Sequence, residues 1–499
     1  MGKVLATPGV YIEEKSAFSS SVVPVATAVP AFIGYTEKAT RGTKSLLNLP
    51  TRISSMAEYE ELFGGSPNTM FTITADPQSG YKLVAENATR FLLHSSLRFY
   101  FSNGGGDCYI VSVGDYKKGI NAKDFNDPAT GAGLVSLLKY MEPTLLVVPE
   151  AILLEKADCF SLQQAMLNHC GYTMKNRFAI LDVYNGGSER TLDADDVVNQ
   201  FREGVGANFL QWGAAYYPFV NTTIVQATEL GFTNISNRDG LIEILTKEVA
   251  DALQAGLLKD ARAESIKTEI AKIATTNSPD DVENLSGTLK AISPTFKAVL
   301  SDMKDQLNIM PLSPAMAGIY AMVDNSINIA KAPANISVGS VVSPLVSITQ
   351  DGQEDLNLPL NGKAINAIRT FQGKGTLVWG ARTLDGNSQD WRYISVRRTM
   401  TFLEQSVKMA AERYVFEPNN ATTWTSLRAM VTNFLNNQWQ GGILAGSTPD
   451  DAFSVEIGLG VTMTPNDILD GLLKLTVKVA ITRPAEFIVI TFQQQQQKS

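Results

Sequence analysis

Apolar positions in residues 134–330 form short continuous runs, separated by stretches with helical periodicity. The runs are TLLVVPE at 144–150, RFAILDV at 177–183 and WGAAYYPFV at 212–220. Runs without polar alternation are typical of parallel strands that are buried on both faces. We therefore predict an α/β unit in which helices pack on a parallel sheet.

Shorter elements are predicted nearer the N-terminus. Residues 31–37 and 107–115 have the composition of strands. Residues 55–65 are amphipathic and end in two glycines, which predicts a short helix. Residues 81–105 predict a longer helix, or a helix together with a strand. The glycines at 104–106 precede a strand instead of following one, so they indicate a turn and not a dinucleotide site.

Helical periodicity dominates residues 240–307, which we interpret as a charged helical insertion on the surface of the α/β unit. Within it, Ser278 followed by Pro279 is typical of a helix start. Residues 338–360 are rich in loop-forming positions, and we expect a domain boundary near 355.

The last third of the chain has an α+β pattern. Two long helical segments, 391–418 and 422–439, are flanked by segments with strand character at 375–384, 452–460 and 472–481. We therefore expect a second domain that differs in architecture from the α/β unit.

The N-terminal residues 1–30 are predicted to form an extended arm. Their prolines exclude a long helix, and the strand-like positions are Val10, Tyr11 and Ile12. Charge is low between residues 16 and 36, which favours an arm that lies against another surface.

The C-terminal end contains an apolar segment, FIVITF at 487–492, followed by five glutamines. Ordering six residues costs ~6–12 kcal/mol. Burial of Phe487, Ile488, Val489 and Ile490 returns ~1.5–3 kcal/mol for each side chain. The strand therefore needs cover on both faces and a complete set of ladder hydrogen bonds, which addition to another sheet edge provides. We interpret the glutamines as a polar stop after the strand.

The composition is that of a globular protein with several domains: 499 residues, 44% hydrophobic and 18% charged. A net charge of −8 argues against a nucleic-acid binder. No apolar run reaches the ~18 residues of a membrane span, and the N-terminus lacks the apolar core of a signal peptide. We expect synthesis in a reducing cytoplasm, which three cysteines in so long a chain also fit.

Candidate chemistry is sparse, because the chain has only two histidines. His169 lies beside Cys170, which is eleven residues after Cys159. This spacing is not a recognised zinc pattern, and we expect a structural role. Glu150 and Asp182 follow predicted strands and could form a carboxylate pair of a hydrolase-like α/β enzyme. No nucleophile, histidine or phosphate loop accompanies them in the sequence, so no catalytic residue, metal or cofactor is predicted.

Positive charge is concentrated in residues 360–430, which contain ten basic and five acidic residues and thus a net charge of +5. Two interpretations stay open at this stage: solvated helix faces with paired charges, or a face that docks on an acidic surface. The adjacent residues Arg397 and Arg398 begin the longest amphipathic segment of this region.

Motifs are distributed over most of the chain: TPGVYIEE (7–14), FSNGGGDCYIVSV (101–113), SPAMAGIYAMVDNSINIAKAPAN (313–335), AINAIRTFQGKGTLVWGARTL (364–384), YISVRRTMTFLEQSV (393–407), VFEPNNATTW (415–424) and ITRPAEFIVITF (481–492). Together these motifs resemble the sheath protein of contractile phage tails and phage-tail-like injection systems. Ser112 departs from the family pattern, in which an arginine is common, and the glutamine run has no place in it. The ending RPAEF and the long inserted domain are most similar to sheaths of extracellular contractile injection systems of the antifeeding-prophage and virulence-cassette type.

The resemblance implies a multidomain tail-sheath fold of α/β and α+β type, with a core domain built from N- and C-terminal segments, an inserted α/β domain and extended terminal arms. The domains expected on this basis are an N-terminal arm (1–30), an outer subdomain (31–120), a central α/β domain (121–354) with its helical insertion (240–307), a core domain that faces an inner tube (355–483) and a C-terminal strand arm (484–499).

The resemblance also implies function and partners. Copies would form rings of six that stack helically around an inner tube, and contraction would drive the tube into a target membrane. Baseplate, tail-terminator and paralogous sheath proteins would be further partners, and the particle would be made in the bacterial cytoplasm and released. The expected inter-subunit arm residues are Val10, Tyr11, Ile12, Phe487, Ile488, Val489, Ile490 and Phe492, and the expected tube-facing residues are Arg397, Arg398, Lys408 and Arg413.

Overall fold

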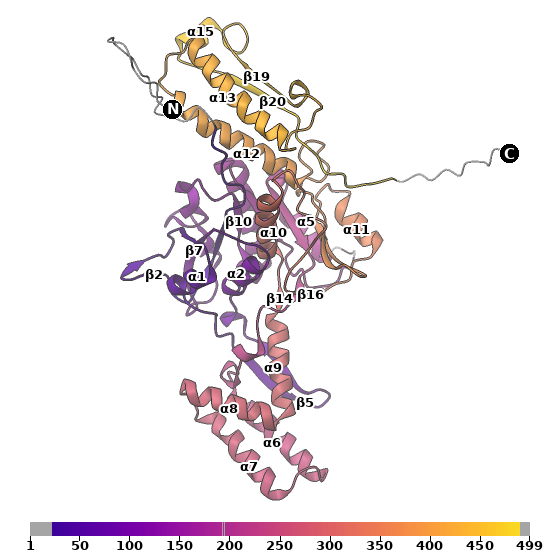
Figure 1. Ribbon diagram of the computed structural model, residues 1–499. Helices are drawn as coiled ribbons and strands as arrows, with labels where there is room; N and C mark the ends of the chain where they lie inside the picture. Colours follow the sequence, from indigo (N-terminus) through magenta and orange to yellow (C-terminus); the bar gives the residue numbers. More distant parts are fainter. Residues whose placement is uncertain (1–21, 192, 194, 490–499) are drawn as a thin grey trace, which may run out of the picture. The chain divides into compact units, whose positions relative to one another are not determined.

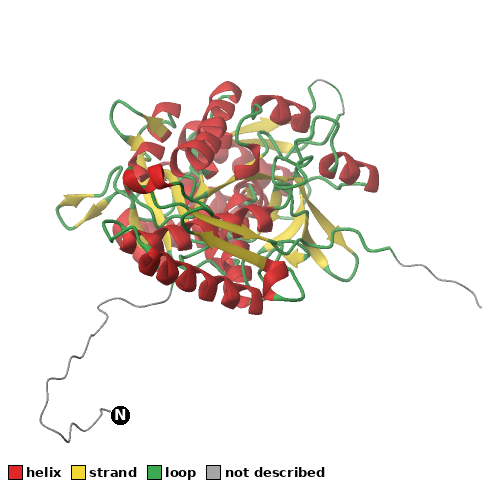
Figure 2. Ribbon diagram, turned by 90° about the horizontal axis from the view of Figure 1, so that it is seen from above, coloured by secondary structure: helices red, strands yellow, loops and turns green. Residues whose placement is uncertain are grey.

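The computed structural model describes residues 22–191, 193 and 195–489, which fall into two compact units (Figure 1). The smaller unit consists of the described N-terminal residues up to Val25 together with Phe402–Thr482. The larger unit contains Ala26–Thr401 and the residues from Arg483 onward. Helices and strands both make up large parts of the chain (Figure 2), as the mixed α/β and α+β pattern predicts.

A nine-stranded sheet forms the centre of the larger unit, in the order β15-β18-β17-β12-β11-β10-β1-β7-β4. Neighbouring strands from β7 to β17 are parallel, whereas β4, β18 and β15 are antiparallel additions at the edges. The predicted parallel strands are thus confirmed. Their bounds are β1 Pro30–Thr36, β4 Thr51–Ile53, β7 Cys108–Asp115, β10 Leu145–Val147, β11 Phe178–Asp182, β12 Gly213–Tyr217, β15 Ile336–Ser337, β17 Asn366–Phe371 and β18 Gly375–Trp379.

Helices cover both faces of this sheet. Leu145 and Val147 of β10 point into the same core as the helices α2 (Leu93–Ser102) and α10 (Ser313–Ser326). Leu146, between them, belongs to the core on the opposite face, which includes side chains of α4 (Lys156–Asn168) and α5 (Val197–Gly204). Because successive strand residues point to opposite faces, both sets must be apolar, which explains the continuous apolar runs.

The helical insertion has a hydrophobic core of its own. The helices predicted in 240–307 are confirmed, and a hairpin at 71–85 joins them in this core. One helix begins at Pro279 as predicted, but the Ser278 side chain makes no capping hydrogen bond. The elements of the insertion are β5 (Phe71–Asp76), β6 (Gly80–Ala85), α6 (Arg238–Gln254), α7 (Asp260–Ala271), α8 (Pro279–Ile292) and α9 (Pro294–Leu307).

The smaller unit is built on two helices and a two-stranded antiparallel sheet. The sheet consists of β19 (Phe453–Ile457) and β20 (Leu475–Val479), which pair over their full length. Helix α13 (Ala421–Gln440) lies against β19. The remaining elements of this unit are the C-terminal part of α12 (Ile394–Ala411), α14 (Pro449–Ala452) and α15 (Pro465–Leu469).

Short elements complete the chain. The predicted helix at 55–65 and the predicted strands at 31–37 and 107–115 are confirmed, and the segment 81–105 contains a strand followed by a helix. The remaining elements are β2 (Thr40–Arg41), β3 (Lys44–Ser45), α1 (Met56–Phe63), α3 (Ala122–Phe125), β8 (Asn126–Asp127), β9 (Ala132–Gly133), β13 (Val220–Thr222), β14 (Ile309–Met310), β16 (Val341–Pro344) and α11 (Gln350–Asn357).

The structure corrects two of the expected domain boundaries. The boundary expected near 355 lies at Phe402, inside α12, because β17 and β18 extend the central sheet and cannot separate from it. Residues 31–120 are not a subdomain of their own, since β1 and β7 lie within that same sheet. A unit that combines N-terminal with C-terminal residues is present, but it begins at Phe402 instead of 355.

Candidate functional site

The root of the C-terminal arm is held by a buried arginine. Arg382, which follows β18, is 1% exposed. Its Nε donates to Oε1 of Glu486 at 3.0 Å and its Nη2 donates to Oε2 at 2.6 Å, so the two side chains meet in a two-point contact. Its Nη1 donates to the carbonyl oxygens of Asn357 and Gly386. We call this contact the Arg382–Glu486 clamp.

Two further groups complete the clamp around the carboxylate. Asn357 donates its Nδ2 to Oε1 of Glu486 at 2.8 Å, and the Tyr393 hydroxyl donates to Oε2 at 3.2 Å. Burial pushes the pKa of Glu486 upward, but the hydrogen bonds from Arg382 and Asn357 outweigh it and lower this pKa. Glu486 is therefore held as an anion, and the chain is fixed at this position.

Immediately after the clamp the chain becomes exposed. Phe487, Ile488 and Val489 are 68%, 80% and 89% exposed and belong to no strand. The described half of the predicted C-terminal strand therefore lacks a partner within the described chain. Ile490 and Phe492 lie outside the described residues, and so do Val10, Tyr11 and Ile12 of the N-terminal arm. Their role between subunits stays a prediction.

A second buried arginine holds the root of the N-terminal arm. Arg398 of α12 donates its Nη2 to the carbonyl oxygen of Thr27 at 2.9 Å. The same guanidinium contacts both carboxylate oxygens of Asp324 at 2.6 and 3.1 Å and lies 4.7 Å from the centre of the Tyr320 ring. The Arg398 and Asp324 side chains are only 3% and 2% exposed. The arm thus leaves the larger unit from a fixed point.

These contacts correct the tube-facing role expected for Arg397 and Arg398. Arg397 lies between the rings of Trp212 and Trp391, 4.3 Å from each ring centre, and is 5% exposed. A guanidinium enclosed by its own chain cannot face a partner. The burial of Arg397 and Arg398 could not be predicted from the net charge of residues 360–430, because a count of charged residues does not distinguish buried side chains from exposed ones. The other two residues, Lys408 and Arg413, are exposed, and their role stays a prediction.

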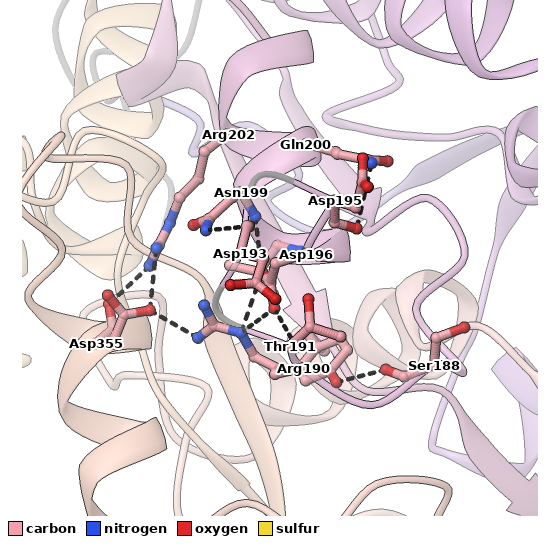
Figure 3. Close-up of polar contacts among 12 residues, drawn as sticks. Ser188, Arg190, Thr191, Asp193, Asp195, Asp196, Asn199, Gln200, Arg202 and Asp355 are labelled. Atoms are coloured by element: carbon pink, nitrogen blue, oxygen red, sulfur yellow. Dashed lines mark hydrogen bonds and ion pairs between the residues drawn. The ribbon is translucent and has the colours of Figure 1, made fainter.

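Helix α11, which supplies Asn357 to the clamp, is itself bound by charged groups to α5 and to the loop before it (Figure 3). Asp355 of α11 accepts from Arg190 Nη1 at 2.6 Å and from Arg202 Nη1 at 3.0 Å. Arg190 is positioned in turn by Asp196, whose Oδ1 also accepts the N–H groups at the start of α5. Since Asn357 lies two residues after Asp355, the arm root is connected to the body of the larger unit through α11.

Glu150, the first of the two strand-end acids, caps a helix. Its Oε1 accepts the backbone N–H groups of Leu92 and Leu93, at the start of α2, at 2.9 and 3.1 Å. Its Oε2 accepts the N–H of Tyr35 at 2.9 Å. Burial raises the pKa of Glu150 to about 7, and the three N–H donors act in the opposite direction.

Asp182 caps α10 in the same way. Its Oδ1 accepts the N–H groups of Leu312 and Ser313, and its Oδ2 accepts the Ser313 hydroxyl at 2.5 Å. Burial raises its pKa to about 6. Both carboxylates accept hydrogen bonds from backbone N–H groups at the start of a helix, which have no partner within the helix itself. The geometry therefore gives no support to the hydrolase alternative.

The two caps predict unequal responses to amide substitution. Glu150→Gln is expected to destabilise the protein by about 1–3 kcal/mol, because the amide NH₂ must then face either the Tyr35 N–H or both helix N–H groups. Asp182→Asn is expected to cost less than about 1 kcal/mol, because the Ser313 hydroxyl can rotate and accept. Chemical denaturation of both variants tests this difference, and equal losses would contradict it.

His169, Cys159 and Cys170 are buried in the interior of the larger unit. His169 Nε2 lies 3.1 Å from Nη1 of Arg177, and burial lowers its pKa to about 3. Cys159 and Cys170 are buried, which raises each thiol pKa to about 12. Within residues 22–191, 193 and 195–489, no three or more histidine, cysteine or acidic side chains gather as metal ligands would.

The sheet of the smaller unit has two open edges. β19 and β20 pair only with each other among the described strands. Thr476 and Lys478 of β20 are exposed, whereas Leu475, Val477 and Val479 are half-buried. A two-stranded sheet is marginally stable by itself and its edges accept further strands.

The described helices include none with the length and apolar character that crossing a bilayer requires.

Comparison with known proteins gives matches at both the sequence and the structural level. Residues 387–495 match the family described as phage tail sheath C-terminal domain. Over 167 residues the chain is 29% identical to the tail sheath protein of Enterobacteria phage T4. That alignment covers 33% of this chain and 25% of the phage protein, so it spans about a quarter of this relative's length.

Solved structures match over the full chain. The sheath of the PVC extracellular contractile injection system, in its contracted state, is 28% identical with a TM-score of 0.62, and 99% of each chain is covered. A chain of the anti-feeding prophage baseplate in its contracted state is 25% identical with a TM-score of 0.64, and 98% of this chain and 99% of that chain are covered.

Proposed function

We propose that this chain, which is similar to tail sheath proteins in sequence and fold, is the structural subunit of a contractile sheath that polymerises as stacked rings around an inner tube. The observation that carries the proposal is the match of 99% of the chain to a contracted injection-system sheath at 28% identity. The match of residues 387–495 to the sheath C-terminal domain supports it independently.

Copies are joined by exchange of their terminal arms. Phe487, Ile488 and Val489 are exposed apolar residues beyond a fixed root, and they pair with no strand of the described chain. We infer that they extend the β19–β20 sheet of a neighbouring copy. The N-terminal arm, rooted at Thr27, would occupy the other edge of such a sheet.

Other sheet edges are poorer acceptors. The outer strands of the nine-stranded sheet, β4 and β15, are only three and two residues long. The hairpin β5–β6 is longer, but Asn237 already donates to the carbonyl oxygen of Ile73 and accepts its N–H, and Gln306 donates to the carbonyl oxygen of Leu83. The strands β19 and β20, five residues each, match the length of the predicted arm strand.

This arrangement permits movement without dissociation. The clamp fixes residue 486, whereas the bound strand would begin at 487, so the peptide between them is the pivot. Subunits could then rotate as rigid bodies while each arm stays paired with its neighbour. Contraction of the sheath would be the sum of these rotations and would drive the tube into a target membrane.

The inner tube is the second proposed partner. Lys408 and Arg413 are exposed at the end of α12 and just after it, where they could contact an acidic tube surface. Substitution of both by Glu is expected to weaken tube-templated assembly roughly tenfold at low salt, and less at high salt. Co-sedimentation with tubes measures the effect. The exposed lysines Lys259 and Lys297 of the helical insertion, changed in the same way, are the matched control; equal effects of the two pairs would contradict a tube-facing role.

Further partners and the location follow from the same proposal. Because a similar chain occurs in the anti-feeding prophage baseplate, we propose that end copies of this sheath contact a baseplate, and that a terminator caps the other end. Sheath paralogues could share the polymer. The assembled particle would be completed in the bacterial cytoplasm and then released, without nucleic acid as a partner, and it would act on a membrane only through the tube.

Size-exclusion chromatography followed by negative-stain microscopy of the full chain, with and without its tube protein, tests the proposal. Rings or long tubes are expected in the presence of the tube. A monodisperse monomer under all conditions would contradict the sheath function and would favour an enzyme or another soluble role.

A further inference from the structure

A cavity of about 130 Å³ lies where the helical insertion joins the central sheet of the larger unit. The sheet side contributes residues 66–69, Arg90 from the segment before α2, and Ser95 from the first turn of α2. The insertion side contributes Glu229, from the segment before α6, and Leu307, the last residue of α9. The cavity therefore has walls from both parts of this unit.

Arg90 is an unpaired cation in this wall. Its side chain is partly buried, and within the described part of the chain it makes no hydrogen bond, ion pair or ring contact. Burial lowers the pKa of its guanidinium, and no neighbouring charge offsets that effect. By contrast, the arginines at 177, 382 and 398 are each held by several acceptors. A desolvated cation without a partner is costly.

No acidic side chain that lines the cavity pairs with Arg90 in the described part of the chain. Glu229 is neutralised by Arg98, which meets its two oxygens at 2.7 and 3.0 Å. The hydroxyls of Ser66 and Ser95 make no hydrogen bond to any described residue, so both can donate into the cavity. The cavity thus offers one free guanidinium and two free hydroxyls.

We propose that this cavity binds a small oxyanion, with Arg90 as the charge partner and Ser66 and Ser95 as additional donors. The planar guanidinium fork matches the geometry of a phosphate or a carboxylate. The volume of about 130 Å³ admits an anion of the size of inorganic phosphate or a short dicarboxylate, and it is too small for a nucleotide, because sites for larger ligands have roughly 300–1,000 Å³.

Binding would have a structural consequence. The three proposed donors, Ser66, Arg90 and Ser95, lie on the sheet side, and the insertion side contributes the facing wall, which includes Leu307. An anion in the cavity would therefore fill the space between the helical insertion and the part that carries the central sheet. The inference is independent of arm exchange, since none of the lining residues belongs to an arm or to the smaller unit.

Calorimetric titration of the full chain with inorganic phosphate, and separately with succinate, in a buffer with chloride as its only other anion, tests the proposal. One-site binding of at least one of the two is expected, and the preferred probe distinguishes a phosphate site from a carboxylate site. Arg90→Gln is expected to weaken binding by about tenfold or more. Arg262→Gln, at an exposed position on α7, is the matched control and should bind as the parent chain does.

A melting curve separates a ligand site from a purely structural residue. Without phosphate or succinate, Arg90→Gln should melt at the parent temperature or above it, because it removes a partly buried charge that has no partner among the described residues. With the anion, only the parent chain and Arg262→Gln should gain in melting temperature. Absence of saturable binding of both probes, equal affinity of Arg90→Gln, or a lower melting temperature of that variant in chloride would each overturn the proposal.

Discussion

Removal of residues 487–499 is expected to abolish polymerisation while both units of the chain remain folded. The truncation ends at Glu486, so the Arg382–Glu486 clamp stays complete. What is lost is the apolar segment that begins with three exposed residues, Phe487, Ile488 and Val489. Because these side chains contribute little to the core of their own copy, the melting temperature should stay close to that of the full chain.

Negative-stain microscopy and a melting curve measure both parts of this expectation. A shorter truncation that removes only 493–499, which contains the glutamine run, is the control and should still form polymers. Full-length sheaths from the chain lacking 487–499 would contradict the connecting role of the arm. Loss of polymers in the control would assign that role to the glutamine run instead.

Arg382→Ala is expected to destabilise the larger unit by about 2–4 kcal/mol. It removes the charged partner of the Glu486 carboxylate, which keeps the donors Asn357 and Tyr393. It also removes the Arg382 donor from the carbonyl oxygens of Asn357 and Gly386. This loss of stability is no larger than that expected when a fully buried ion pair is broken, because the Glu486 side chain is 20% exposed and can be partly hydrated. The variant should also polymerise poorly, since the arm root is no longer fixed.

A double-mutant cycle with Glu486→Gln isolates the clamp from other effects of removing a large side chain. Urea denaturation of the two single variants and the double variant should give a coupling energy of about 1–3 kcal/mol. Arg483→Ala is the matched control, because Arg483 is half exposed, donates to the Gln389 carbonyl and lies 3.8 Å from Asp390. This variant should lose less than about 1 kcal/mol of stability. If the stability losses of the two single variants add up to the loss of the double variant, the Arg382–Glu486 contact itself contributes nothing to stability, which would contradict the account.

The contribution of the Arg382–Glu486 clamp to folding stability should decrease at acidic pH. The pKa of Glu486 is lower in the folded chain than its ordinary value, so the clamp contributes its full stability above the unfolded glutamate pKa of about 4.3. This contribution is lost as the pH falls from there through the lowered folded value.

The central sheet could be predicted from the sequence because its signal is local. Each inner strand is a short run that is apolar on both faces, and such runs at 144–150, 177–183 and 212–220 became β10, β11 and β12. The domain boundary could not be predicted in this way. Whether 366–379 pairs with β12 or with the strands that follow depends on long-range hydrogen bonds, which leave no trace in local periodicity.

In the candidate site, too, local features could be predicted from the sequence and long-range contacts could not. The apolar arm after residue 486 is visible in the sequence, but its anchor is not, because Arg382 and Glu486 are 104 positions apart. A signal was nevertheless present, because each of the two charged residues stands next to apolar residues, Arg382 after Ala381 and Glu486 between Ala485 and Phe487. Glu150 and Asp182 were recognised as unusual positions, but only the structure distinguishes a helix cap from a catalytic acid, because it shows which groups the oxygens accept from.

The most direct test of the account is a cryo-electron microscopy reconstruction of the polymer that this chain forms around its tube. The account predicts that residues 487–492 continue as a strand on the β19–β20 sheet of a different copy, while Glu486 remains bound to Arg382 of its own chain. A reconstruction in which residues 487–492 fold back on their own copy, or lie unpaired in solvent within an intact polymer, would contradict it.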